Sequence, residues 1–121
     1  MNTRRINGDT LEILNGDELI ISLAEKLVAN EMHIDVSGEI KNEVAHEFED
    51  ELMAAFSVCG VVKVDLSKVT YIASLAMRAL LSVQQIVDEN DELSLVITKI
   101  SPEVKEMFEA AGFLDILNIE E

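Results

Sequence analysis

The stretch Val61-Val-Lys-Val-Asp-Leu-Ser-Lys-Val-Thr-Tyr-Ile-Ala-Ser74 leads from a β-branched run into a helical pattern, and it decides the fold. Val61–Val64 is typical of an inner strand, because β-branched side chains suit a pleated, buried sheet. We expect Asp65–Lys68 to turn the chain out of this strand. Residues 75–88 then carry apolar side chains at helical spacing, and Ser74 is the expected N-cap of that helix.

Strands and helices alternate on both sides of this stretch. Met32–Val36 alternates between apolar and polar residues, which predicts a half-buried strand that Gly38 ends. Residues 43–57 form an amphipathic helical pattern, and Leu93–Thr98 reads as another strand. Ser101-Pro102 marks a helix start, because a capping hydroxyl precedes a proline at the first helical position. The order predicts an α/β fold in which crossover helices pack on a mixed β-sheet with parallel strands.

The N-terminal part differs from the rest in its pattern. Residues 1–9 are polar, and we expect them to be irregular. Asn15-Gly16 separates two apolar stretches, which favours a β-hairpin; a short helix is the alternative, and Gly16 disfavours it. We therefore expect residues 1–23 to be an N-terminal extension that can form a β-hairpin, followed by a single domain over residues 24–121.

The composition restricts the class of protein. The chain has 121 residues, 49% of them apolar, and a net charge of −15 from 24 acidic and 9 basic residues. This charge disfavours nucleic acid and anionic membrane surfaces, because both are bound through lysine and arginine. It suits docking onto a partner with positive surface, although solubility alone would also explain it. We find no signal peptide and no apolar run of about 20 residues, so we expect a cytoplasmic protein without membrane insertion.

The sequence offers little for catalysis or for metal binding. Cys59 is the single cysteine, and His33 and His46 are the two histidines, so no common set of metal ligands is present. Glycine-rich phosphate loops and the glycines of a nucleophile elbow are missing from the pattern. We therefore expect no cofactor, no metal and no enzymatic activity.

Three stretches together resemble the STAS domain family, in particular bacterial anti-sigma-factor antagonists. Ile34-Asp-Val-Ser-Gly-Glu-Ile40 resembles the family's first strand and its SGEL turn. Val64-Asp-Leu-Ser-Lys-Val-Thr-Tyr-Ile72 is similar to its DLSxVxFID segment. Ser101-Pro-Glu-Val-Lys105, with Phe108 and Gly112, resembles its SPxVxxxFxxxG helix. The resemblance covers roughly residues 24–119.

This resemblance implies regulation by partner switching. In such proteins a Ser or Thr at the start of the second helix is phosphorylated by an anti-sigma factor that is a GHKL-type serine kinase, and phosphorylation breaks their complex. The corresponding residue here is Ser74, for which plain helix capping is the competing interpretation. The chain departs from the family pattern at Ala73, where the family has Asp, at Ala76, where it has Gly, and at Lys41, where it often has Asp.

The resemblance also implies where a partner binds. Leu75 is either an exposed apolar anchor or a residue tucked into the sheet, and the second interpretation is favoured. The expected partner-binding residues are Glu39, Lys41, Asn42, Ala73, Leu75, Met77 and Arg78.

We expect a monomer or weak homodimer. A phosphorylation-independent STAS module, as scaffold or transporter-associated subunit, is the main alternative function, and a flavodoxin-like small enzyme or nucleotide-binding protein is a third.

Overall fold

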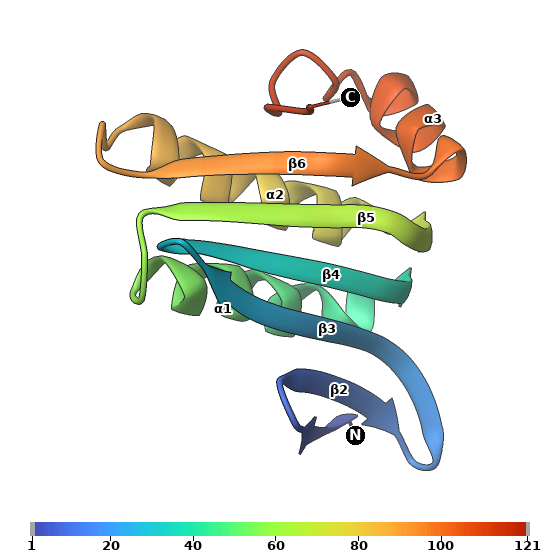
Figure 1. Ribbon diagram of the computed structural model, residues 1–121. Helices are drawn as coiled ribbons and strands as arrows, with labels where there is room; N and C mark the ends of the chain where they lie inside the picture. Colours follow the sequence, from blue (N-terminus) through green and yellow to red (C-terminus); the bar gives the residue numbers. More distant parts are fainter. Residues whose placement is uncertain (1, 121) are drawn as a thin grey trace.

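A computed structural model describes residues 2–120, so Met1 and Glu121, which end the two expected ranges, lie outside the described residues. Over residues 2–120 the chain forms a six-stranded sheet whose strands follow one another in chain order, with helices between the later strands (Figure 1). This arrangement confirms the predicted α/β fold. The strands are β1 (Asn2–Asn7), β2 (Thr10–Asn15), β3 (Glu18–Val28), β4 (Glu31–Ile40), β5 (Val61–Ile72) and β6 (Ser94–Ile100). The helices are η1 (Asn42–Val44, 3-10), α1 (Ala45–Phe56), α2 (Ser74–Asp88) and α3 (Pro102–Ala111).

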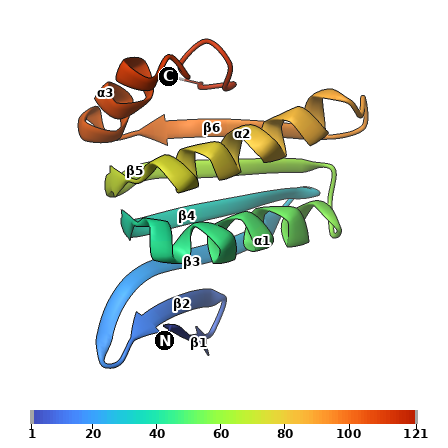
Figure 2. The same cartoon turned by 180° about the vertical axis from the view of Figure 1, so that it is seen from behind.

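The sheet is antiparallel in its first half and parallel in its second. Strands β1 to β4 pair antiparallel with their neighbours, whereas β4 pairs parallel with β5, and β5 with β6. A parallel pair needs a crossover, and the α1 and α2 segments supply the two crossovers. Both helices lie side by side on the same face of the sheet (Figure 2).

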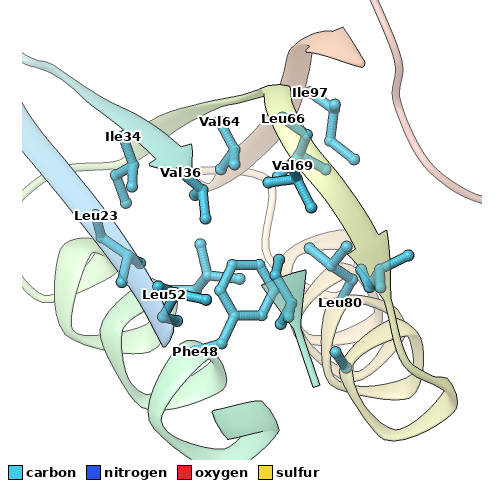
Figure 3. Packing of buried hydrophobic residues seen from close by; sticks show 14 of the residues in the cluster. Leu23, Ile34, Val36, Phe48, Leu52, Val64, Leu66, Val69, Leu80 and Ile97 are labelled. Carbon is cyan, nitrogen blue, oxygen red and sulfur yellow. The ribbon is translucent and has the colours of Figure 1, made fainter. Parts of the chain in front are cut away.

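The core lies between this face and the two helices. Ile34 and Val64 point from the sheet toward Phe48 of α1 and Leu80 of α2 (Figure 3), and all four side chains are fully buried. Burial of an apolar side chain of this size contributes about 1.5–3 kcal/mol. The apolar stripe that predicted the first helix is therefore the stripe that packs on the sheet.

Residues 2–7 differ from the prediction, because they form the edge strand β1 and are not irregular. The strand pairs with β2 along its whole length. Two further bonds attach it to the α1 region: Arg4 Nη2 lies 2.5 Å from Glu51 Oε1, and Asn2 Nδ2 donates to the Glu43 carbonyl at 2.9 Å. Between β2 and β3, Gly16 occupies the turn with φ +65°.

Strands β4 and β5 are both longer than predicted. The prediction that Asp65–Lys68 leaves the sheet was wrong, because β5 continues to Ile72 and the pairing register shifts along this stretch. The prediction that Gly38 ends the preceding strand was also wrong, because β4 continues to Ile40. In both places an irregularity in the ladder accommodates residues that commonly end strands.

The C-terminal part begins with the predicted helix start. Ser101 caps α3, since its Oγ accepts a hydrogen bond from the Val104 N–H at 3.2 Å and donates to the Val69 carbonyl at 2.6 Å. Gly112 follows α3 in the left-handed conformation, with φ +77°. The chain then returns along β6, where Ile119 forms an isolated parallel bridge with Ile97.

Candidate functional site

The expected partner-binding residues lie where two neighbouring parallel strands end. Glu39 of β4 pairs with Tyr71 of β5, and Ile40 pairs with Ile72. The Ala73 N–H then donates to the Ile40 carbonyl at 2.8 Å, which holds the two chain segments together as they leave the sheet. Carboxyl ends of adjacent parallel strands are a common place for binding sites in α/β proteins.

A groove of about 760 Å³ lies at this end of the sheet. Its rim includes Tyr71, a residue that the sequence interpretation missed because its segment was expected to leave the sheet. Tyr71 is 42% exposed, and Leu75 on the neighbouring helix is 48% exposed. Aromatic and apolar side chains that remain exposed beside charged ones are typical of binding sites. The groove is lined by Glu39, Lys41, Asn42, Glu43, Thr70, Tyr71 and Ala73.

Ser74 is the first residue of α2 and is not its N-cap. The N-cap is Ala73, with extended backbone angles of φ −79° and ψ 164°. The Ser74 side chain is exposed, and its hydroxyl makes no hydrogen bond within residues 2–120. The interpretation of Ser74 as a plain capping residue was therefore wrong, because its hydroxyl accepts no hydrogen bond from the backbone N–H groups of the first turn of α2.

Asn42 does the capping instead, from another part of the chain. Its Oδ1 accepts a hydrogen bond from the Leu75 N–H at 3.3 Å. This bond satisfies one of the backbone donors that every helix start leaves free. It also fixes the segment after β4 against the first turn of α2, so the two halves of the site are joined by a side chain.

The remaining predicted residues differ in their exposure and in their contacts. The interpretation that Leu75 tucks into the sheet was wrong, because the first turn of α2 directs it outward to solvent. Met77 is half-buried and packs against the core. Lys41 Nζ lies 3.4 Å from Glu39 Oε2. Arg78 is exposed, follows Ser74 by four positions on the same helix, and has no ion pair in the described part of the chain.

The histidines and the cysteine lie away from the groove. His46 Nε2 is 3.3 Å from Asp50 Oδ2 on the exposed side of α1, and His33 Nε2 is 3.8 Å from Glu31 Oε1. The Cys59 Sγ donates to the Val61 carbonyl at 3.2 Å. Residues 2–120 contain no cluster of three or more His, Cys, Asp or Glu side chains placed to hold a metal ion.

Among the described helices, none combines the length and the apolar character that a membrane crossing requires.

Comparison with solved structures gives the same fold. An anti-sigma factor antagonist from Mycobacterium paratuberculosis superimposes with a TM-score of 0.72 at 18% identity, covering 83% of this chain and 85% of that chain. The anti-sigma factor antagonist SpoIIAA in its unphosphorylated form gives a TM-score of 0.66 at 12% identity, over 82% and 88% of the two chains. SpoIIAA of Bacillus in its phosphorylated form gives 0.61 at 11% identity, over 82% and 91%.

Comparison with known sequences identifies the family. No curated protein sequence matches the chain. A family profile described as "Mlab, STAS domain" matches residues 23–118, which is most of the chain. The match begins inside β3 and extends through α3, so it includes both strand ends at the groove and the start of α2. The chain therefore belongs to the STAS domain family.

Proposed function

We propose that the protein is an anti-sigma-factor antagonist that acts by partner switching, with Ser74 as the phosphate acceptor. The observation that carries this proposal is the environment of the Ser74 hydroxyl. It is exposed at the first turn of α2, and it makes no hydrogen bond within residues 2–120. Because this hydroxyl makes no hydrogen bond that stabilises α2, its phosphorylation removes no capping interaction. Phosphorylation can therefore change partner binding without changing the fold.

The local charges favour a phosphate at this position. A phosphate adds about −1.5 to −2 charges and three acceptor oxygens, and a helix N-terminus stabilises such an anion. Arg78 lies four positions further along α2, a spacing at which side chains on a helix meet. The guanidinium has no other ion pair among the described residues and can therefore bind the phosphate.

The surface around Ser74 suits a protein partner. Tyr71 and Leu75 are exposed apolar side chains beside it, and Lys41, Glu39 and Arg78 supply charges at the rim. Such a surface binds through its apolar centre and gains specificity from its charged rim. A phosphate placed in this centre would break the complex through its bulk and its cost of desolvation. The proposed partner is a cytoplasmic anti-sigma factor that is a serine kinase of the GHKL type.

The proposal has solved relatives that support it. SpoIIAA, with the same fold, has been solved in an unphosphorylated and in a phosphorylated form. Both forms of SpoIIAA have this fold, which is consistent with a phosphorylation that changes the surface and leaves the domain folded.

The experiment compares three variants in binding to the purified kinase partner. Ser74→Ala should bind with unchanged affinity and resist phosphorylation with ATP, whereas Ser74→Asp should bind at least tenfold more weakly. Ser82→Asp is the matched control, because Ser82 is exposed on the same helix two turns further along. Equal binding by Ser74→Asp and Ser82→Asp, or phosphate found on another residue, would exclude Ser74 as the switch.

A second function is favoured by the residues beside Ser74. Ala73 and Ala76 replace the acid and the glycine that the family carries there, and Leu75 adds an apolar anchor to the surface. A phosphorylation-independent STAS module, acting as a scaffold or as a transporter-associated subunit, would use this surface permanently. Intact-mass spectrometry on the protein from its native cells separates the two: a complex that persists with no phosphate on Ser74 under any growth condition favours the scaffold.

A further inference from the structure

The groove at the strand ends continues sideways past β4. A second hollow of about 270 Å³ shares Glu39, Lys41 and Glu43 with the groove, so the two adjoin. This side groove is also lined by Glu18 and Leu19 at the start of β3. Because β3 runs antiparallel to β4, it begins at the side of the sheet where β4 and β5 end (Figure 1). The groove and the side groove together therefore cross the ends of three neighbouring strands.

The side groove depends on residues that precede the matched domain. Ile21 pairs with Gly38, which places the residues before Ile21 beside those after Gly38. A Cβ added to Gly38 would clash with the Ile20 carbonyl oxygen, so the glycine lets the two strands approach closely. The family profile begins at residue 23, so Glu18 and Leu19 belong to the N-terminal extension. The extension thus supplies one side of a surface whose other side is the STAS domain.

This surface combines an exposed apolar side chain with carboxylates that lack partners. Leu19 is 49% exposed. The carboxylates of Glu18 and Glu43 have no ion pair and no hydrogen bond among residues 2–120, whereas Lys41 Nζ lies 3.4 Å from Glu39 Oε2. Apolar contacts and complementary charges are the two features by which protein interfaces gain affinity and specificity. The complement of this surface is an apolar group flanked by cations.

We infer that the side groove binds a short extended segment of the partner protein in which an apolar side chain is flanked by lysine or arginine. The inference rests on the proposed function, because it takes the adjoining groove as part of the partner-binding surface. Three strands about 4.8 Å apart span about 10 Å, which an extended chain crosses in about three residues. The apolar side chain contacts Leu19, and the flanking cations pair with Glu18 and Glu43. The N-terminal extension therefore contributes to the choice of partner.

The test selects random dodecapeptides displayed on phage against the full chain, at about 150 mM salt, where nonspecific attraction is screened. Peptides that also bind the double variant Glu18→Gln/Leu19→Ser are removed, because they bind elsewhere. We expect the remaining peptides to share an apolar residue flanked by lysine or arginine. The tightest of them is synthesised, and its Kd is measured by fluorescence anisotropy. If no peptide remains, or if the remaining peptides lack this motif, the inference is overturned.

Single variants locate the bound peptide. Leu19→Ser removes the apolar contact and Glu18→Lys reverses a charge, and each should weaken peptide binding about fivefold or more. Leu27→Ser and Glu89→Lys are the matched controls, because Leu27 is 52% exposed on the same strand, Glu89 is exposed after α2, and neither lines the groove or the side groove. The controls should leave Kd within about twofold of the original. Equal losses in the controls and in the side-groove variants would also overturn the inference.

Binding of the purified kinase partner distinguishes this inference from the proposed function, since peptide binding is measured without phosphorylation. Suppose that Ser74→Asp leaves kinase binding unchanged while Glu18→Lys and Leu19→Ser weaken the binding of both kinase and peptide. The switch at Ser74 then fails and the side groove stands. If Ser74→Asp abolishes kinase binding while Glu18→Lys and Leu19→Ser have no effect on it, the side groove fails and the switch stands.

Discussion

The side chain of Asn42 and the backbone of Leu75, 33 positions apart in the sequence, are joined by a hydrogen bond of 3.3 Å from the Leu75 N–H to Asn42 Oδ1. This bond gives α2 a capping group that its own N-cap, Ala73, does not have. The start of α2 is therefore stabilised by the segment that follows β4. The two segments that bear the proposed partner-binding surface are coupled through one side chain.

The first prediction follows from this bond. Asn42→Ala should lower the free energy of unfolding by about 1 kcal/mol, the usual effect of losing a capping side chain, and should speed hydrogen exchange at the Leu75 amide. Asn42→Asp is the matched variant, because a carboxylate accepts the same bond and suits the positive end of α2. Urea denaturation and exchange measured by NMR test both variants. Equal stability and exchange in Asn42→Ala and the original chain would contradict the capping role.

The same substitution at two helix starts should have different effects. Ser101→Ala should cost about 2–3 kcal/mol, because it removes the cap of α3 and leaves the Val69 carbonyl without a donor in a site that is 4% exposed. Ser74→Ala should change stability by less than about 0.5 kcal/mol, as expected for an exposed hydroxyl without a hydrogen bond. Urea denaturation compares the two variants. If Ser74→Ala lowered the free energy of unfolding as much as Ser101→Ala does, the Ser74 hydroxyl would contribute to stability.

Two glycines with positive φ should also respond differently to alanine. At Gly38, φ is +110° and an added Cβ would lie 2.4 Å from the Ile20 carbonyl oxygen, so the neighbouring strand would have to move. Gly38→Ala should cost about 3 kcal/mol or more. At Gly8, φ is +67° and no atom lies within 4 Å of an added Cβ, so Gly8→Ala should cost only about 1 kcal/mol. Thermal and urea unfolding of the two variants test whether the close strand contact causes the difference.

Glu25 predicts a dependence of stability on pH. Burial, the charge of Glu51 and a hydrogen bond to Glu51 together raise the pKa of Glu25 from 4.5 to about 7, although the charge of Arg4 acts to lower it. Between pH 4.5 and 7 the folded chain therefore keeps a proton that the unfolded chain releases. The free energy of unfolding should fall as pH rises through this window and should level off above it.

The variant Glu25→Gln isolates this effect. Glutamine has no proton to release, so the free energy of unfolding of the variant should vary less between pH 5 and 7 than that of the original chain. The difference in free energy of unfolding between the two chains should favour the variant at the higher pH. Urea denaturation at several pH values measures both chains. Parallel curves for the two chains across this range would show that Glu25 does not retain a proton in the fold.

The elements that were predicted correctly are those whose signal is local. The β-branched run Val61–Val64 and the Ser101-Pro102 helix start form as expected, because neighbouring residues decide them. β1 was missed because its residues are polar; its pairing with β2 and the Arg4–Glu51 ion pair are tertiary contacts without a local pattern. The extent of β5 was missed because a strand irregularity and a turn have the same residue preferences.

The candidate site, like the fold, has features that the sequence predicts and features that only tertiary structure decides. Of the residues chosen from the resemblance, Glu39, Lys41, Asn42 and Ala73 line the groove at the two strand ends, whereas Tyr71 also lines it and was missed. The exposure of Leu75 depends on how α2 is rotated on the sheet, and the N-cap depends on the backbone angles of Ala73. Neither can be read from residue types alone.

The order of the strands has a consequence for how the chain folds during synthesis. Within residues 2–120 each strand pairs with the strand made immediately before it, and no strand is inserted later between two earlier ones. Loop closure becomes more costly as the loop lengthens, so the hairpins from β1 to β4 close at low entropic cost. They can form as they leave the ribosome, and each crossover then needs only its own helix before the next strand docks. This topology exposes one growing sheet edge at a time to nascent-chain aggregation.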